Sequence, residues 1–192
     1  MIQAEHQSEL DEALRKIGRN VLNIQRMEAM LKFLVSRSNI EGKASELRSN
    51  QEKAVAAVTR QTMGNLVKSF VGSVYATPSE IEDEADVEID EVWIRLSFRI
   101  EADSAHIEQR QAELNALVEE RNKLIHQLLG EFDQTSIESC RKLGELLDEQ
   151  AERVRPEYEK LKSLILVLND ARKEAFKAIE EQLITGATKG KE

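Results

Sequence analysis

Apolar residues recur every three or four positions along most of this chain, and this spacing constrains the fold more than any other feature. Between about residues 3 and 36 the apolar stripe continues over several heptads, which predicts one long amphipathic helix. The stripe consists of Leu10, Leu14, Ile17, Val21, Ile24, Met27, Leu31 and Leu34. Phe33 and Val35 widen it, so we expect this helix to pack against more than one neighbour.

The same spacing predicts a second helix over about residues 44–71. Gly64 lies inside it, and a glycine in a helix costs about 1 kcal/mol relative to alanine, so a kink or a close contact fits there. Residues 36–42 contain two serines, an asparagine and Gly42, a composition typical of a turn between the first two helices.

Two further apolar stripes follow in the second half of the chain. A third helix is expected from about residue 104 to Gly130, and a fourth from about residue 136. Pro156 interrupts or kinks the fourth helix, because proline lacks the backbone N–H that a helix interior uses. Asn169 and Asp170 mark a place where the remaining stripe divides again.

One segment has a different period. Between residues 92 and 100, apolar residues alternate with Trp93, Arg95, Ser97 and Arg99, which predicts a β-strand. Residues 87–89 form a shorter alternating run, and the two residues after them could turn the chain. We therefore expect a β-hairpin insertion at about 86–101.

These patterns together predict a mainly α fold, a helical bundle of four to five helices with the β-hairpin insertion at 86–101. The 192 residues suit one well-buried domain, expected over residues 1–186. Residues 187–192 are rich in glycine and lysine and are expected to form a flexible tail.

The charge distribution limits the classes of partner. The net charge is −9, and the run from Glu80 to Glu91 holds eight acidic residues and no basic residue, which leaves the rest close to neutral. An acidic chain repels polyanions over roughly 8 Å at physiological salt. Broad nucleic-acid binding through a basic patch is therefore disfavoured.

Sequence motifs for metals, cofactors and membranes are absent. The three histidines, His6, His106 and His126, are scattered and form no HExxH or Glu-x-x-His motif, so we predict no metal and no cofactor. The single cysteine, Cys140, lies on an apolar stripe and is expected to be a buried thiol. The sequence contains no run of about 18 apolar residues, so no membrane helix is predicted. The polar, acidic N-terminus does not resemble a signal peptide. A cytoplasmic location is expected.

The candidate site is a polar cluster inside the third predicted helix. Arg121 continues a heptad series with Leu114 and Leu128, which puts a guanidinium in line with an apolar stripe. Asn122 and His126 are four residues apart and are therefore expected to share one helix face beside Arg121.

An arginine followed by a polar residue, with histidine five positions after the arginine on a helix, resembles the motif of the HEPN domain. This resemblance implies a metal-independent endoribonuclease or RNA-binding protein of a toxin, defence or RNA-processing type. It also implies a homodimer that brings two motifs together, an RNA substrate and an antitoxin or other protein partner. His126 would then transfer protons at the ribose 2′-OH or the leaving oxygen, Arg121 would bind the phosphate, and Asn122 would orient both.

The residue types suit this chemistry on their own. An imidazole transfers protons near neutral pH without a metal, and a guanidinium binds a phosphate better than an ammonium does. Each chain offers these groups only once, so a symmetric pair of helices would supply the second set.

Two other interpretations remain open. Arg121 could extend out of the stripe to pair with an acid, which would leave Asn122 and His126 as a solvated face. The chain could also be a non-catalytic helical interaction protein that acts as a homodimer, through the wide stripe of the first helix or the edge of the predicted strand.

Overall fold

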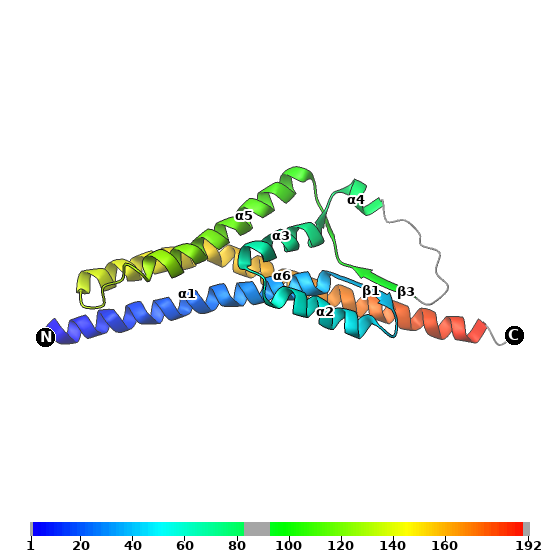
Figure 1. Ribbon diagram of the computed structural model, residues 1–192, viewed down its shortest axis with the longest axis horizontal. Helices are drawn as coiled ribbons and strands as arrows, with labels where there is room; N and C mark the ends of the chain where they lie inside the picture. Colours follow the sequence, from blue (N-terminus) through cyan, green and yellow to red (C-terminus); the bar gives the residue numbers. More distant parts are fainter. Residues whose placement is uncertain (1, 83–92, 190–192) are drawn as a thin grey trace.

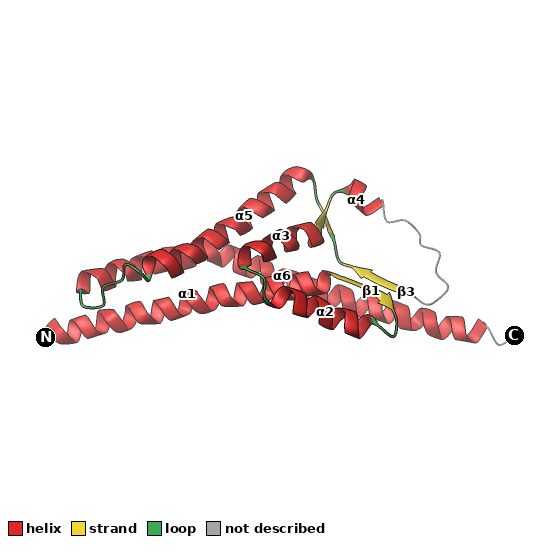
Figure 2. Ribbon diagram, in the orientation of Figure 1, coloured by secondary structure: helices red, strands yellow, loops and turns green. Residues whose placement is uncertain are grey.

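The computed structural model describes residues 2–82 and 93–189, and its architecture is mainly α-helical (Figure 1, Figure 2). The described residues contain six α-helices: α1 (Ile2–Ser38), α2 (Leu47–Thr59), α3 (Met63–Val74), α4 (Pro78–Glu82), α5 (Ser104–Lys123) and α6 (Ile137–Lys189). A π-helical turn, η1 (Leu124–Leu128), continues α5. The strands are β1 (Asn39–Lys43), β2 (Tyr75–Ala76), β3 (Trp93–Ser97) and β4 (Ile100–Glu101). The predicted mainly α fold class is confirmed.

Three long helices lie together at one end of the molecule (Figure 1). α1 and α6 run in the same direction. Two contacts between them show this: Lys16 bonds Asp148 and Asn20 bonds Gln150, so that the partner on α6 moves forward in sequence as the residue on α1 does. α5 runs against both of them, and a short connection joins it to α6. α1 also packs against α2 and α3, so the expectation of several neighbours for the first helix is confirmed.

The core consists of the apolar stripes of α1, α3, α5 and α6. Its fully buried members are Met27, Leu31, Leu34, Leu66, Val67, Phe70, Val74, Leu114, Leu124, Leu147, Leu161 and Leu168. Burying one such side chain stabilises the fold by about 1.5–3 kcal/mol, so this cluster dominates the packing energy. Among the helices of the described residues, none has the length and apolarity that crossing a bilayer requires.

The predicted turn at 36–42 is wrong, and the predicted strand after residue 92 is confirmed with a different partner. α1 continues to Ser38, and the next five residues form β1, which pairs antiparallel with β3. Residues 87–89, the expected hairpin partner, lie outside the described residues. β1 contains a single buried apolar side chain, Ile40, so its own alternation was too weak to predict a strand. Pairing with β3 stabilises this segment as a strand, although the side-chain pattern of β1 alone does not predict one.

The second predicted helix is two helices in the structure. α2 ends at Thr59, and Thr62 caps the start of α3 by accepting a hydrogen bond from the backbone N–H of Asn65. The break therefore precedes Gly64, which lies in the first turn of α3. Together with α4, this division gives more helices than the four to five expected.

α6 is continuous over 53 residues, so neither Pro156 nor Asn169-Asp170 interrupts the helix, and the expected division of this segment is wrong. Proline inside a helix costs about 3 kcal/mol, chiefly through one lost hydrogen bond and a steric clash. Pro156 is exposed, whereas Val154 and Leu161 beside it are buried in the core. Packing on both sides of Pro156 therefore outweighs its local cost. α6 continues through residues 187–189 of the expected tail, and residues 190–192 lie outside the described range.

Candidate functional site

The polar cluster lies where α5 changes from α-helix to π-helix. Arg121 and Asn122 belong to the last turn of α5, and His126 belongs to η1. Leu124 and Leu128 in this turn are buried, whereas Asn122 and His126 are exposed and Arg121 is half-buried. A π-helical turn fits an extra residue into the helix and often accompanies a functional site. The turn therefore keeps the leucines in the core while it changes the direction of the polar side chains between them.

Asn122 and His126 share one surface hollow of about 460 Å³, as their spacing predicted. Glu119, Glu120 and Lys123 also line this hollow. Because both lining residues of the motif can hydrogen-bond and one can transfer a proton, the hollow can hold a polar ligand.

Arg121 is held beside this hollow and does not line it. Its Nη1 donates a hydrogen bond to Oδ1 of Asn122 at 3.0 Å. The structure therefore links Arg121 to Asn122 and places Asn122 with His126. It does not bring Arg121 and His126 of one chain to the same hollow.

Hydrogen bonds connect Glu120, which lines the hollow, to α6. Arg153 donates from Nε to Oε1 of Glu120 at 2.6 Å, and Gln150 donates from Nε2 to the Glu120 backbone carbonyl at 2.9 Å and to Oε2 at 3.1 Å. Burial raises the pKa of Glu120, but the hydrogen bonds from Arg153 and Gln150 outweigh this effect and hold the pKa below its ordinary value. The Glu120 carboxylate is therefore ionised at neutral pH, and Arg153 compensates its charge.

A buried amide pair extends this connection to α1. Gln150 is fully buried, and its Oε1 accepts a hydrogen bond from Nδ2 of Asn20 at 3.1 Å. Nδ2 of Asn20 also donates to the carbonyl of Leu147 at 2.7 Å. Three helices are thus held in one register by polar groups directly behind the hollow.

The sequence reasoning missed Glu120, Gln150 and Asn20. A signal was present, because Asn20 and Gln150 each stand within an apolar stripe, where a buried polar residue requires a partner. Which partner each one finds depends on the parallel alignment of α1 and α6.

Cys140 is buried, as predicted, and burial raises the pKa of its thiol, which favours a structural role over a nucleophilic one. In the part of the chain that the structure describes, no cluster of three histidine, cysteine, aspartate or glutamate side chains has the geometry of a metal site.

Comparison with protein-family models, with curated proteins and with solved structures found no match to this chain.

Proposed function

We propose that this chain cleaves RNA without a metal, at a composite site that two copies of the chain form around Arg121, Asn122 and His126. The observation that supports the proposal is the accessible hollow at the π-helical turn, which Asn122 and His126 line together. The Arg121–Asn122 hydrogen bond, in turn, orients the guanidinium at the edge of this hollow.

In the proposed reaction, the ribose 2′-oxygen attacks the adjacent phosphorus and the bond to the 5′-oxygen breaks. His126 of one copy accepts the 2′-OH proton, and a water molecule donates a proton to the leaving 5′-oxygen. The products are a 2′,3′-cyclic phosphate and a 5′-hydroxyl. Arg121 binds the phosphate and stabilises the negative charge that develops on its oxygens.

The second copy is required because Arg121 and His126 of one chain do not share a hollow. Ile125, which stands between the two in sequence, is 37% exposed and offers an apolar contact for a second copy. A twofold axis near this residue would bring Arg121 of one chain toward His126 of the other.

The test is the cleavage of an end-labelled single-stranded RNA in the presence of a metal chelator. We expect Arg121→Ala and His126→Ala each to lower the rate by about 10²–10⁴-fold, the usual contribution of a general acid–base group. Gln111→Ala is the matched control, because Gln111 is on the same helix and bonds only to Asn115 among the interactions found. Full activity in both site variants would disprove the enzyme hypothesis.

Mixing the two inactive variants tests the composite site. If Arg121 and His126 act across the interface, each mixed dimer contains one intact site, and about a quarter of all sites regain activity. If both residues act within one chain, mixing restores nothing.

A second candidate function is that of a non-catalytic helical interaction protein acting as a homodimer. The observation that favours it is the exposure of apolar side chains on α6, where Leu166 is 59% and Val167 is 54% exposed. Replacing both with glutamate, as Leu166→Glu and Val167→Glu, would then convert a dimer to a monomer in sedimentation equilibrium. A dimer that persists in this variant would exclude this face as the interface.

A further inference from the structure

A small hollow of about 70 Å³ lies where the ends of α1 and β3 meet α6. Arg37 of α1 and Arg172 of α6 both line it. In Figure 1 the β1–β3 pair, which begins where α1 ends, is far from the end of α5 that carries Asn122 and His126. The proposed RNA-cleavage site involves neither arginine, so the chemistry of this hollow is independent of that proposal.

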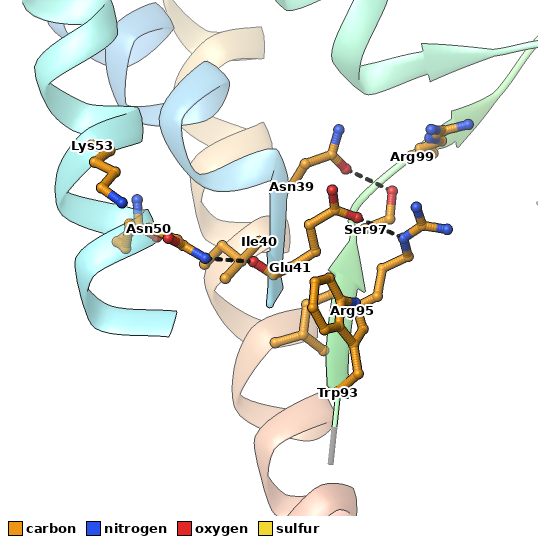
Figure 3. A pocket seen from close by; sticks show the side chains of 11 residues that line it. Asn39, Ile40, Glu41, Asn50, Lys53, Trp93, Arg95, Ser97 and Arg99 are labelled. Carbon is orange, nitrogen blue, oxygen red and sulfur yellow. Dashed lines mark hydrogen bonds and ion pairs between the residues drawn. The ribbon is translucent and has the colours of Figure 1, made fainter. Parts of the chain in front are cut away.

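Hydrogen bonds between the strand pair and the end of α1 hold the walls of the hollow. The backbone N–H of Phe98 donates to the carbonyl of Ser38, the last residue of α1, at 2.7 Å. Ser97 donates to Oδ1 of Asn39 at 2.7 Å across β1 and β3 (Figure 3). Leu168, which is fully buried, lines the hollow from α6. The two arginines are therefore carried by elements that are fixed to one another.

Each guanidinium lies next to a phenylalanine of its own helix. The guanidinium carbon of Arg37 is 4.2 Å from the centre of the Phe33 ring, and that of Arg172 is 6.0 Å from the centre of the Phe176 ring. Each phenylalanine is four residues from its arginine, a spacing that brings two side chains together on one helix face. A guanidinium that lies over a ring is positioned without the use of its N–H donors, which stay available to a ligand.

Within residues 2–82 and 93–189, neither arginine forms an ion pair with a carboxylate. Arg37 donates from Nη1 to Oγ of Ser36 at the long distance of 3.4 Å. On β3, by contrast, Arg95 donates from Nε to the carboxylate of Glu41 at 2.9 Å (Figure 3). Burial and the positive charge of Arg37 lower the pKa of Arg172. Two half-buried cations thus share one hollow, and each destabilises the other until an anion compensates them.

We propose that Arg37 and Arg172 together bind a phosphate group at this hollow, either as the free ion or as the end of a small phosphate monoester. A phosphate dianion would compensate both charges, and its oxygens can accept parallel hydrogen bonds from each guanidinium. A carboxylate carries one charge and would leave one arginine uncompensated.

The size of the hollow supports a single oxyanion. Its volume of about 70 Å³ is little more than twice the ~30 Å³ that one water molecule occupies in the liquid. Sites for larger molecules occupy roughly 300–1,000 Å³. The hollow therefore suits a phosphate group, and the rest of a monoester would extend into solvent.

Isothermal titration calorimetry of the full chain with inorganic phosphate tests the proposal, at fixed ionic strength and about pH 8, where a phosphate group carries two charges. Methyl phosphate and acetate are titrated separately. We expect one phosphate to bind per chain with a dissociation constant below about 1 mM, and acetate to bind at least about tenfold more weakly. Methyl phosphate distinguishes the two sources: an affinity at or above that of the free ion assigns the site to a monoester, and a lower affinity assigns it to free phosphate.

Variants connect binding to the two arginines. We expect Arg37→Gln and Arg172→Gln each to weaken phosphate binding by about tenfold or more, because each removes charge-assisted hydrogen bonds. Lys173→Gln is the matched control: Lys173 follows Arg172 on α6, pairs with Asp170 and does not line the hollow. It removes the same charge from the chain, and its affinity for phosphate should be unchanged.

Melting temperatures separate binding from a structural role of the arginines. Phosphate should raise the melting temperature of the unmodified chain and of Lys173→Gln, since a ligand that binds only the folded state stabilises it, and it should not raise that of Arg172→Gln. A structural role alone would change the melting temperature equally with and without phosphate.

Three results would overturn the proposal: no saturable binding of phosphate, equal affinity for acetate, or unchanged affinity in both glutamine variants. An equal loss in Lys173→Gln and Arg172→Gln would also overturn it, because binding would then follow the net charge. Circular dichroism of each variant shows that the helices are intact. Arg172→Gln keeps the test valid if Arg37→Gln disturbs the end of α1.

Discussion

Replacing Gln150 by leucine tests whether the buried amide pair behind the candidate site holds the three long helices together. The side chain of Gln150 is fully buried. It donates to the backbone carbonyl and to the carboxylate of Glu120, and it accepts from Asn20. Leucine has nearly the same volume, so the substitution removes these hydrogen bonds and leaves little cavity.

The expected cost follows from these contacts. A neutral hydrogen bond contributes about 1 kcal/mol and one to a charged group about 1.5–3 kcal/mol. The two bonds to Glu120 share the Nε2 group, and the apolar burial of leucine returns part of the loss. We therefore expect Gln150→Leu to lower the free energy of unfolding by about 2–3 kcal/mol, a substantial part of the 5–15 kcal/mol typical of a domain.

The assay is urea unfolding followed by far-UV circular dichroism at one fixed protein concentration. Asn20→Leu is measured in parallel, alone and combined with Gln150→Leu. Because the Asn20–Gln150 bond at 3.1 Å is shared, the double variant should lose about 1 kcal/mol less than the sum of the single losses.

Gln7→Leu is the matched control, because Gln7 is exposed on α1 and bonds only to Asp11 one turn away among the interactions found. Its free energy of unfolding should change by less than about 0.5 kcal/mol. If Gln150→Leu is as stable as the control, or if the double variant is strictly additive, the amide pair does not couple the helices and the reasoning is refuted.

Two further predictions concern pH and backbone conformation. Hydrogen bonds, the largest from Lys160, lower the pKa of Glu113 from its ordinary value of 4.5 to about 2, so its contribution to stability is complete above pH 4.5 and is lost as the pH falls toward 2. Glu113→Gln should therefore flatten the decline of the urea midpoint between pH 4.5 and 2.5, and an unchanged slope would contradict the assignment. Gly42→Ala should lower the free energy of unfolding by about 1–3 kcal/mol, since φ is +142° and the new Cβ would meet Asn50. Gly72→Ala should raise the free energy of unfolding by about 1 kcal/mol, because Gly72 lies in α3 and the new Cβ would meet no atom within 4 Å beyond the backbone of its own helix. Equal shifts of the melting temperature in the two variants would refute the argument.

The periodic parts of the fold could be predicted because their signal is local. α1 follows from an apolar stripe with helical spacing, and β3 follows from strict alternation over five residues. The division of residues 44–71 could not be predicted in the same way. The break before Thr62 depends on where α3 packs against α1 and α5, which the local pattern does not contain.

For the candidate site, the sequence identified Arg121, Asn122 and His126 by type and spacing, and it predicted that Asn122 and His126 share a face. The tertiary structure decided that Arg121 is separated from their hollow. Leu124 and Leu128 are both buried, and the π-helical turn that contains them changes the orientation of the residues on either side.

The sequence by itself thus determined where the long helices and the strand β3 lie and which side chains could do chemistry, because side-chain periodicity and residue type are properties of neighbours in the chain. Only the tertiary structure decided that β1 pairs with β3, that α6 continues through Pro156, and that α1 and α6 align in parallel. Each of these depends on burial and hydrogen bonding between residues far apart in sequence. Such contacts outweigh local propensities of about 1–3 kcal/mol, and they exist only once the helices have packed.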